Sequence, residues 1–591
     1  MDVFGVFNVL SMIGGLAMFL FGMHVMSDSL AKLSGGKMER ILEKLTSNKF
    51  KAVLLGGGVT AVIQSSSATT VMVVGFVNSG IMKLSQAVGI ILGANIGTTV
   101  TSWILSLTGI EGSNFWVQML KPTSFSPILA LIGIVMLMFA KKDKFKDVGT
   151  ILVSFAVLMF GMDMMSDAVA PLKDSPAFAN LFTVFSNPIL GMLAGAALTA
   201  IIQSSSASVG ILQALSSTGA INFASAVPII LGQNIGTCVT ALISSMGASK
   251  NAKRAAFVHL YFNVIGTIVF MALFYGVNAF IHFEFLEGPA TEVGIAVVHT
   301  AFNVLATAVL LPFSKLLEKL ACLTIRDKEE DTDVEPVATE FMMLDMRFME
   351  KPAFAVDQCI KTANNMAEIV RKSVAVAIGL MDSYDARKAD EVSDMESLVD
   401  RYEDELGNYL VNLSTKNLSE EDSRTVSELL HTIGDLERMS DHARNIMEAA
   451  KEMNDKEMSF SDKAKEELQI YTEALMRIVD EAVDSFVHND RKMARLVEPL
   501  EEVIDGLNKE LKQRHIRRLR EGKCTIELGF VLADITTNCE RIADHCSNVA
   551  VSVLQVKHTE LESHEYLDRL RANDPDFKLH YNDFVRIYRL P

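Results

Sequence analysis

A duplicated polar run inside apolar sequence constrains the fold of this chain more than any other feature. The run Q-S-S-S-A at residues 64–68 recurs 139 positions later, at residues 203–207. The same shift carries further short segments of the first unit onto the second: F-G-M at 21–23 onto 160–162, T-A at 60–61 onto 199–200, and N-I-G-T at 95–98 onto 234–237. One constant register across the unit indicates a duplication rather than chance.

Both polar runs lie in sequence that is apolar enough to sit within a membrane. Polar groups at that depth are costly unless they bind something. Two such runs at matching points of two membrane halves are typical of the central substrate site of a transporter. The duplication therefore predicts a transport protein whose substrate binds between two related halves.

The chain has 591 residues, which is too long for one ordinary domain. Its charge divides it into two unlike parts. Residues 1–325 carry a net charge of +4 and contain apolar runs long enough to cross a bilayer core, which needs about 20 helical residues. Residues 326–591 carry a net charge of −21 and are amphipathic, so we expect them to be soluble. We expect no nucleic-acid partner for this chain.

The loop charges predict the orientation of the membrane part. Basic residues mark the cytoplasmic side of short loops, and they crowd the loop after the first apolar segment: Lys32, Lys37, Arg40, Lys44, Lys49 and Lys51. The equivalent loop of the second unit, residues 171–187, has Lys173 as its one basic residue. Opposite charge bias in equivalent loops predicts an inverted-topology repeat in a bacterial-type cytoplasmic membrane. Lys315, Lys319 and Arg326 then place the acidic part in the cytoplasm.

The membrane part is expected to contain two repeats and two further helices. The repeats cover about residues 10–108 and 149–247, and the helices follow at about 256–275 and 293–313. The predicted fold class is all-α: a polytopic membrane transporter with inverted-topology repeats and re-entrant helical hairpins, followed by a soluble helical bundle.

Counting the membrane crossings places each polar run in a re-entrant hairpin. Between the inside loop near Lys51 and the outside loop near Glu111, residues 84–108 supply the one crossing that is needed. The segments 53–80 and 192–219 must therefore each enter and leave on one side. Irregular backbone at membrane depth is tolerated only where protein or a cavity surrounds it, so the two turns should meet near the midplane.

The polar turns offer groups that suit an oxyanion and a small hard cation. Serine hydroxyls and the positive end of a helix suit the anion. Side-chain oxygens of Gln, Asn and Thr suit sodium, and the following segments could add four of them: Asn95, Thr98, Asn234 and Thr237. The alternative is that the small residues only let helices pack closely. Neither run has the G-x-S-x-G pattern of a nucleophilic serine, and we expect no enzyme.

Two later segments repeat a His and an Asn within apolar sequence. They read H-x-x-F-N-V, with Asn263 in the first and Asn303 in the second. Each asparagine could bind a cation or hold two helices together, and the residue type leaves both interpretations open.

These motifs resemble the type II sodium–phosphate cotransporter family, over roughly residues 10–313. The resemblance implies phosphate as substrate and sodium as driving ion. It implies that eight residues of the two polar runs bind them: Gln64, Ser65, Ser66, Ser67, Gln203, Ser204, Ser205 and Ser206. Thr98, Thr237 and Asn263 match positions near the ions in that family. Differences between the repeats, such as Thr99 against Cys238, leave the sodium stoichiometry open.

The acidic part begins with a charged linker at 326–340 and contains a second duplication. The pattern E-R-x-x-D-H-x-x-N at residues 437–445 recurs 103 positions later, at residues 540–548. Apolar residues at helical spacing predict three helices in each half: about 354–383, 388–413 and 420–452, then 461–488, 490–518 and 525–556. Residues 558–591 remain unassigned.

Acidic residues of this second duplication are candidate metal ligands. Glu437 and Asp441 share one helix face, as do Glu540 and Asp544. Neighbouring helices could add four carboxylates: Glu396, Asp400, Glu501 and Asp505. Carboxylates from facing helices suit a divalent metal or iron, and the alternative is a solvated acidic face. The two three-helix repeats resemble the PhoU family over residues 341–557, which implies a cytoplasmic regulatory domain with metal clusters in some members.

Two functions fit the sequence. The first is sodium-coupled transport of inorganic phosphate by alternating access, regulated by the PhoU-like domain. The second is a membrane-anchored phosphate sensor that binds without transport. For a transporter, the sequence leaves open the direction of flux, uptake or export, and whether the chain forms a homodimer.

Overall fold

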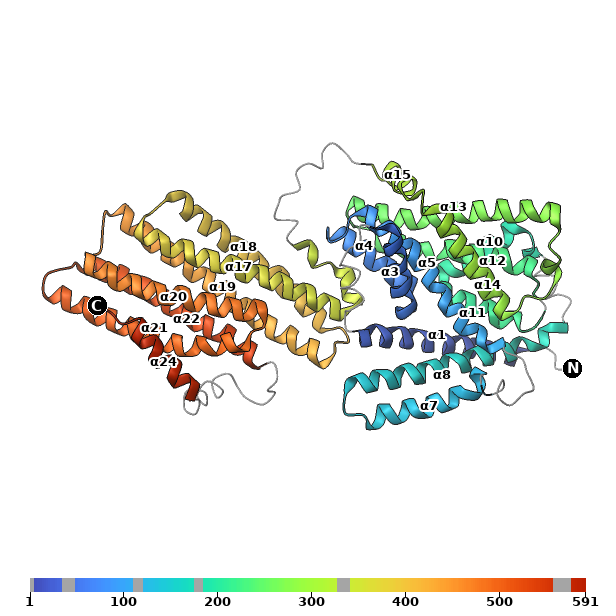
Figure 1. Cartoon of the computed structure of the whole chain (residues 1–591), viewed down its shortest axis with the longest axis horizontal. Helices are drawn as coiled ribbons and strands as arrows, with labels where there is room; N and C mark the ends of the chain where they lie inside the picture. Colours follow the sequence, from blue (N-terminus) through green and yellow to red (C-terminus); the bar gives the residue numbers. More distant parts are fainter. Residues whose placement is uncertain are drawn as a thin grey trace. The chain divides into compact units, whose positions relative to one another are not determined.

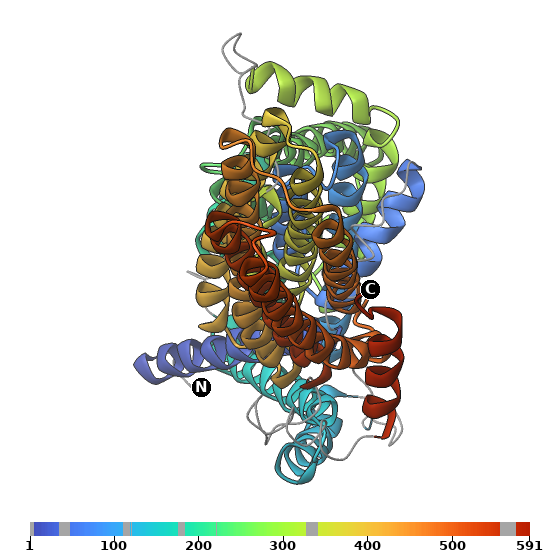
Figure 2. The same cartoon turned by 90° about the vertical axis from the view of Figure 1, so that its left-hand side faces the viewer.

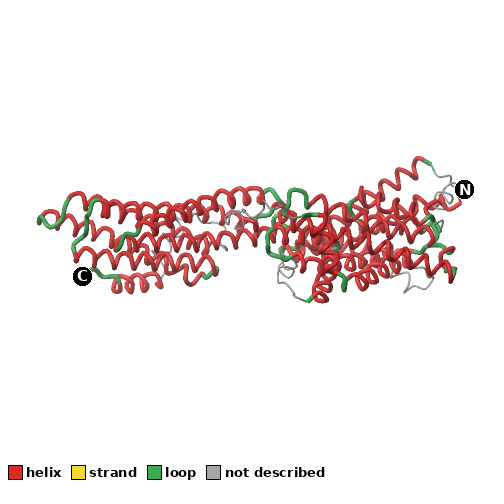
Figure 3. Tube along the Cα trace, turned by 90° about the horizontal axis from the view of Figure 1, so that it is seen from above, coloured by secondary structure: helices red, strands yellow, loops and turns green. Residues whose placement is uncertain are grey.

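The predicted all-α class is confirmed, because the described residues form helices almost throughout (Figure 3). The computed structural model describes residues 5–34, 48–109, 119, 121–174, 184–219, 221–326, 341–555 and 575–591. Lys37, Arg40, Lys44, Glu111 and all of the 326–340 linker after Arg326 lie outside the described residues. The chain divides into two compact units, Met1–Phe354 and Ala355–Pro591, and each is considered by itself.

Helices of the first unit reproduce the duplication seen in the sequence. The first repeat consists of α1 (Val6–Ser34), α3 (Lys49–Ile63), α4 (Ser66–Asn78) and α5 (Leu84–Ser106). The second consists of α8 (Asp143–Val169), α10 (Pro188–Ile202), α11 (Ser205–Ser216) and α12 (Phe223–Ser244). Each repeat therefore places its Q-S-S-S run between two short helices and follows it with a long one.

The short helices end at the polar runs for a local backbone reason. Gln64 takes a left-handed conformation (φ 60°) that ends α3, and Ser65 is extended (φ −145°) and begins α4. Gln203 (φ 60°) and Ser204 (φ −142°) do the same in the second repeat. With 15 residues, α3 has a length of about 22 Å, less than the ~30 Å core of a bilayer. These lengths favour the predicted re-entrant hairpins.

Glycines bring the short and long helices of each repeat into backbone contact. A Cβ added to Gly56 would lie 2.1 Å from the carbonyl oxygen of Ile90, and one added to Gly195 would lie 2.1 Å from that of Ile229. Any larger residue would force these helices apart. The same close contact at equivalent positions shows that α3 packs on α5 as α10 packs on α12.

Six helices of the first unit's described residues are long and apolar enough to cross a membrane, namely α1, α5, α8, α12, α13 (Lys250–Ile281) and α14 (Glu292–Leu310). The sequence missed α7 (Pro122–Phe139), which lies beside α8, as α8 lies beside α1 (Figure 1). A short amphipathic helix, α15 (Ser314–Thr324), follows α14. The helices α13 and α14 each pack against both repeats, through α5 of the first and α12 of the second.

The second unit is a helical bundle, as predicted. Its six long helices have bounds close to the expected ones: α17 (Pro352–Asp382), α18 (Ala386–Ser414), α19 (Glu420–Asp455), α20 (Asp462–His488), α21 (Arg491–Arg520) and α22 (Ile526–Gln555). In the unassigned tail, α24 (Pro575–Ile587), drawn in dark red, packs against α21 (Figure 2). The boundary between the units falls after Phe354, so residues 341–354 lie with the membrane part instead of the soluble part.

Candidate functional site

Each polar run forms the turn of a hairpin, which we call the first serine tip (residues 64–67) and the second serine tip (residues 203–206). The Ser65 hydroxyl oxygen accepts a hydrogen bond from Ala68 N at 3.1 Å, and Ser204 accepts one from Ala207 N at 3.2 Å. Both serines therefore cap their helices, and their own O–H groups still can donate. The first-turn N–H groups of α4 and α11 point out of the helix ends at the same places.

The two serine tips lie against each other. The Ser67 hydroxyl of the first tip donates to the backbone oxygen of Gln203 in the second tip, at 3.4 Å. Ser66, Ser205 and Ser206 are buried beside this contact. The structure thus brings the two predicted groups of ligands together, while their role in binding remains a prediction. Neither tip contains a basic residue, so a bound anion would be held by neutral donors and the helix ends.

The glutamines of the two tips differ in their surroundings. Gln64 is buried, and its side-chain oxygen accepts a hydrogen bond from the Thr101 hydroxyl of α5 at 2.8 Å. Gln203 is exposed. The hydroxyl of the half-buried Thr240, which is equivalent to Thr101, is shielded from solvent with no hydrogen-bond partner among the described residues. The second tip therefore leaves an amide side chain free to reach a ligand or move.

The four predicted asparagines share one geometry. Each donates from Nδ2 to the backbone oxygen four residues before it, at 3.0 Å for Asn95, Asn234 and Asn263 and at 2.8 Å for Asn303. In the described residues, Oδ1 of Asn263 and of Asn303 is buried without a partner. An unpaired amide oxygen favours the cation-ligand interpretation for these two residues. The hydroxyls of Thr98 and Thr237 instead donate to backbone oxygens one turn earlier.

Several polar residues near this region were not among the candidate ligands that the sequence indicated. The His299 ring contacts the Ser102 hydroxyl of α5 at 2.8 Å, and both ring nitrogens of His259 lack a partner among the described residues. Gln213 of α11 donates to the backbone oxygens of Ser102 (3.1 Å) and Glu292 (2.9 Å), and its own side-chain oxygen is buried unpaired. A lone glutamine in an apolar helix is a visible signal, but Gln213 has no counterpart in the other repeat.

The first acidic cluster of the second unit consists of Glu437, Asp441 and Asp400. Burial raises the pKa of Glu437 to about 7, and the negative charges of Asp441 and Asp400 add to the shift. The pKa of Asp400 is also raised, first by burial and then by Glu396 and Asp441. Glu396 is paired with Arg444 at 2.8 Å. The carboxylates of this cluster therefore lie close enough to repel one another, while their role as metal ligands remains a prediction.

The second acidic cluster repeats this arrangement with Glu540, Asp505 and Asp544. Burial raises the pKa of Glu540, and a hydrogen bond with Asp505 raises it further. The pKa of Asp544 is raised mainly by burial, although Arg541 opposes the shift. Glu501 lies one helical turn before Asp505 on α21. Across the described ranges, no three His, Cys, Asp or Glu residues are close enough to hold a metal ion, so the predicted metal sites are not preformed.

The His and Asn of the repeated pattern serve a structural purpose that the sequence did not reveal. His545 contacts Asp435 of α19 at 2.8 Å, and Asn548 donates to the same carboxylate at 2.9 Å. Reciprocally, His442 and Asn445 contact Asn538 of α22 at 2.8 and 3.1 Å. The two imidazole rings stack with centroids 5.8 Å apart. These contacts lock the two three-helix halves together, leaving the acidic residues of the pattern for other roles.

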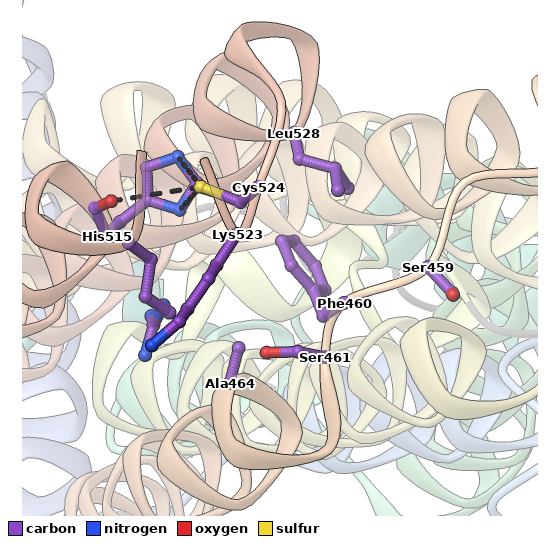
Figure 4. Close-up of a pocket in the computed structure, with 9 residues that line it drawn as sticks. Ser459, Phe460, Ser461, Ala464, His515, Lys523, Cys524 and Leu528 are labelled. Atoms are coloured by element: carbon purple, nitrogen blue, oxygen red, sulfur yellow. Dashed lines mark hydrogen bonds between the residues drawn. The ribbon is translucent and has the colours of Figure 1, made fainter. Parts of the chain in front are cut away.

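A small cavity of about 200 Å³ lies between the start of α20 and the turn from α21 to α22 (Figure 4). The Cys524 sulfur lies 3.7 Å from His515 Nε2, and Phe460 and Lys523 also line the cavity. Arg518, another lining residue, is paired with Glu467 at 2.6 Å. The cavity shares no residue with the acidic clusters.

Comparison with known families matches both units. The Na+/Pi-cotransporter family model matches residues 18–167 and 158–301, and the PhoU domain model matches residues 363–450 and 471–553. The Na+/Pi-cotransporter model thus matches the chain twice, and each match contains one of the two serine tips. The chain belongs to the Na+/Pi-cotransporter family and carries a PhoU domain behind its membrane part.

Three relatives illustrate the range of similarity. "Putative inorganic phosphate export protein YjbB" of Salmonella typhimurium is 24% identical over 568 residues, which cover 95% of this chain and 100% of the relative. "Uncharacterized protein YqeW" of Bacillus subtilis is 30% identical over 311 residues, covering 52% and 96%. "Sodium-dependent phosphate transport protein 2A" of Rattus norvegicus is 38% identical over 99 residues, covering 16% and 15%.

Proposed function

We propose that this protein is a transporter, rather than an enzyme, that moves inorganic phosphate across the cytoplasmic membrane by alternating access. The contact between Ser67 and the Gln203 backbone carries this proposal, because it unites two duplicated groups of donors in one place. Serine O–H groups and two helix N-termini suit a phosphate oxyanion. In this proposal Ser65–Ser67 and Ser204–Ser206 bind one phosphate together.

Sodium is the proposed coupling ion. The tips contain no basic residue, so co-bound cations would balance the phosphate charge. The unpaired oxygens of Asn263 and Asn303 suit a hard cation. The other four predicted ligands, Asn95, Thr98, Asn234 and Thr237, lie on α5 and α12, which pack against the helices of these two asparagines. The name of the rat relative, which specifies sodium-dependent phosphate transport, supports the same ion for this chain.

The direction of net flux is a separate part of the proposal. YjbB matches this chain over nearly its whole length, and its name specifies phosphate export. The architecture shared with YjbB favours export under conditions in which the PhoU domain signals high internal phosphate. Uptake is the alternative, and a sensor without transport is a second one, because the same tips could bind phosphate without releasing it on the other side.

The PhoU domain is proposed to regulate the transport unit from the cytoplasm. The donor types of the two acidic clusters fit a divalent metal or iron, because a cation would favour the charged form of Glu437 and Glu540, whose pKa values are raised first by burial and then by neighbouring carboxylates. The residues that would hold such an ion are Glu437, Asp441, Glu396 and Asp400 in one cluster, and Glu540, Asp544, Glu501 and Asp505 in the other.

Flux of labelled phosphate in proteoliposomes tests this function. Purified full-length protein is reconstituted, and sodium and phosphate gradients are imposed in both directions. Phosphate movement that depends on sodium supports the transporter. Binding of phosphate without flux in either direction would overturn it in favour of the sensor, and flux that is equal in sodium and choline would overturn sodium coupling.

A further inference from the structure

Residues 345–354 pack on the far end of the helix that carries the first serine tip. The tip forms the N-terminus of α4, and a helix of 13 residues is about 20 Å long. At its C-terminal end, α4 contacts a short 3₁₀ helix, η6 (Met346–Glu350), which lies in the first unit. The segment thus contacts the membrane part at a point joined rigidly to the tip.

Polar side chains fix the segment to the ends of three helices. Asn78, the last residue of α4, donates to Asp345 Oδ2 at 2.7 Å and accepts from the backbone N–H of Ser249 at 2.7 Å. Arg347 donates from Nη2 to the same Asp345 oxygen at 2.6 Å. From Nη1 it donates to the backbone oxygen of Ser244, at the end of α12, at 3.3 Å. One cluster therefore joins the ends of α4 and α12 to the start of α13.

Three aromatic rings complete the attachment. Phe76 of α4, Phe348 of η6 and Phe354 of α17 are all buried, with ring centroids 5.0–5.5 Å apart. Gly75 makes room for the Phe348 ring, because a Cβ at position 75 would lie 2.7 Å from Phe348 Cε1. The close packing makes the position of α4 sensitive to this one ring.

Among the described residues, the second repeat has no equivalent of this attachment. The positions that correspond to Gly75, Phe76 and Asn78 are Ala214, Leu215 and Ser217. The Ser217 hydroxyl donates to the backbone oxygen of Ala214 within its own helix. The attachment is therefore not a general requirement for folding a serine hairpin.

We propose that Asp345–Phe354 is an anchor that positions the first serine tip through α4, and so sets the affinity of the phosphate site. The inference rests on the proposed function for the meaning of that affinity. Because α17 begins at Pro352 within the anchor and continues into the second unit, the anchor is also the place where the PhoU domain acts on the tip. Asn78, Asp345 and Phe348 are positioning residues and do not touch the substrate.

The test displaces the Phe348 ring with a single methyl group. Gly75→Ala is compared with Gly58→Ala, because both glycines are helical but a Cβ at Gly58 has nothing within 4 Å. The double variant Gly75→Ala with Phe348→Leu replaces the obstructing ring with a smaller side chain. We expect Gly75→Ala to raise the KM for phosphate about threefold or more with little change in kcat, the size of effect known for residues that couple distant sites. Gly58→Ala should match the parent, and the double variant should return toward it.

A second readout does not depend on transport. A reporter substitution, Ser67→Cys, is labelled with a thiol reagent in full-length protein, and the protein without the reporter gives the background from native cysteines. We expect Gly75→Ala to change the labelling rate of this cysteine, and Phe348→Leu to restore it. Unchanged KM and labelling in folded Gly75→Ala would overturn the anchor, as would a failure of Phe348→Leu to restore them. Altered labelling, together with no phosphate flux in the parent protein that lacks the reporter, would refute the proposed function and leave the anchor standing.

Discussion

The two serine tips have the same backbone but different surroundings. Gln64 and Gln203 both take a left-handed conformation, and Ser65 and Ser204 both cap the helix that follows. Gln64, however, is buried and accepts a hydrogen bond from Thr101, whereas Gln203 is exposed. The first tip also has an anchor at the far end of α4, whereas the part of the chain that the structure describes shows none for the second.

This difference separates what a duplication preserves from what it leaves free to change. Close glycine contacts and serine caps depend on local sequence, so both copies keep them. The partners of the glutamines and of the helix ends come from elsewhere in the chain and do not repeat. We infer that the first tip is the more rigid of the two and that the second is the one that adapts to substrate.

The largest expected effect comes from removing one buried hydroxyl from each tip. Ser66→Ala and Ser205→Ala should each weaken phosphate binding about 10- to 100-fold, because a hydrogen bond to a charged group contributes ~1.5–3 kcal/mol. Their effects should not add, because both serines are proposed to serve one phosphate. Phosphate KM of the two single variants and the double variant checks this. Parent-like transport in both single variants would remove the tips as the site.

Sodium affinity should depend on the unpaired asparagine oxygens. Asn263→Ala and Asn303→Ala should each raise the sodium KM about tenfold, the equivalent of roughly 1.4 kcal/mol. Sodium dependence of phosphate flux measures this, with thermal unfolding of the same samples as control. A loss of thermal stability with an unchanged sodium KM would show instead that these residues only hold helices together.

Thr101 and Thr240 offer the sharpest test of the difference between the tips. Thr101→Val should destabilise the protein by about 1 kcal/mol, because it leaves the buried Gln64 oxygen unpaired. Thr240→Val removes a hydroxyl that already lacks a partner among the described residues and should be neutral or stabilising. Thermal unfolding in detergent compares the two. Equal losses of stability would contradict the asymmetry of the tips.

The sequence predicted the scaffold better than the surroundings of the site. The repeated Q-S-S-S run gave both hairpins, and the helical spacing gave the six long helices of the second unit. The exposure of Gln203, the contact of Thr101 with Gln64 and the anchor at Asn78 depend on tertiary packing, which no local pattern encodes. For the same reason, Asp435 and Asn538 became visible only when the structure paired them with His545 and His442.

The smallest expected effect lies in the acidic clusters. The pKa of Glu437 is raised to about 7, so the folded state binds a proton more readily than the unfolded state. This group therefore lowers the stability of the fold as pH rises from about 4.5 to 7. Because Glu437 is largely solvent-screened, the effect should be on the order of 1 kcal/mol or less.

Glu437→Gln should remove that part of the pH dependence. Thermal unfolding of the full-length protein between about pH 4 and 8, a range that brackets the window from 4.5 to 7, would show it. A divalent metal should flatten the profile of the parent more than that of the variant, if the cluster binds one. Identical pH profiles for parent and variant would contradict the crowding of carboxylates at Glu437.

Equilibrium binding of labelled phosphate tests the central claim, that two unlike tips form one site, most directly. Purified full-length protein is titrated with phosphate in sodium and in choline, for the parent and for Ser66→Ala and Ser205→Ala separately. The account predicts one phosphate per chain, bound in sodium, with affinity lost on changing either tip. Two phosphates per chain, or the loss of half of the binding sites with the rest unaffected in each variant, would contradict it.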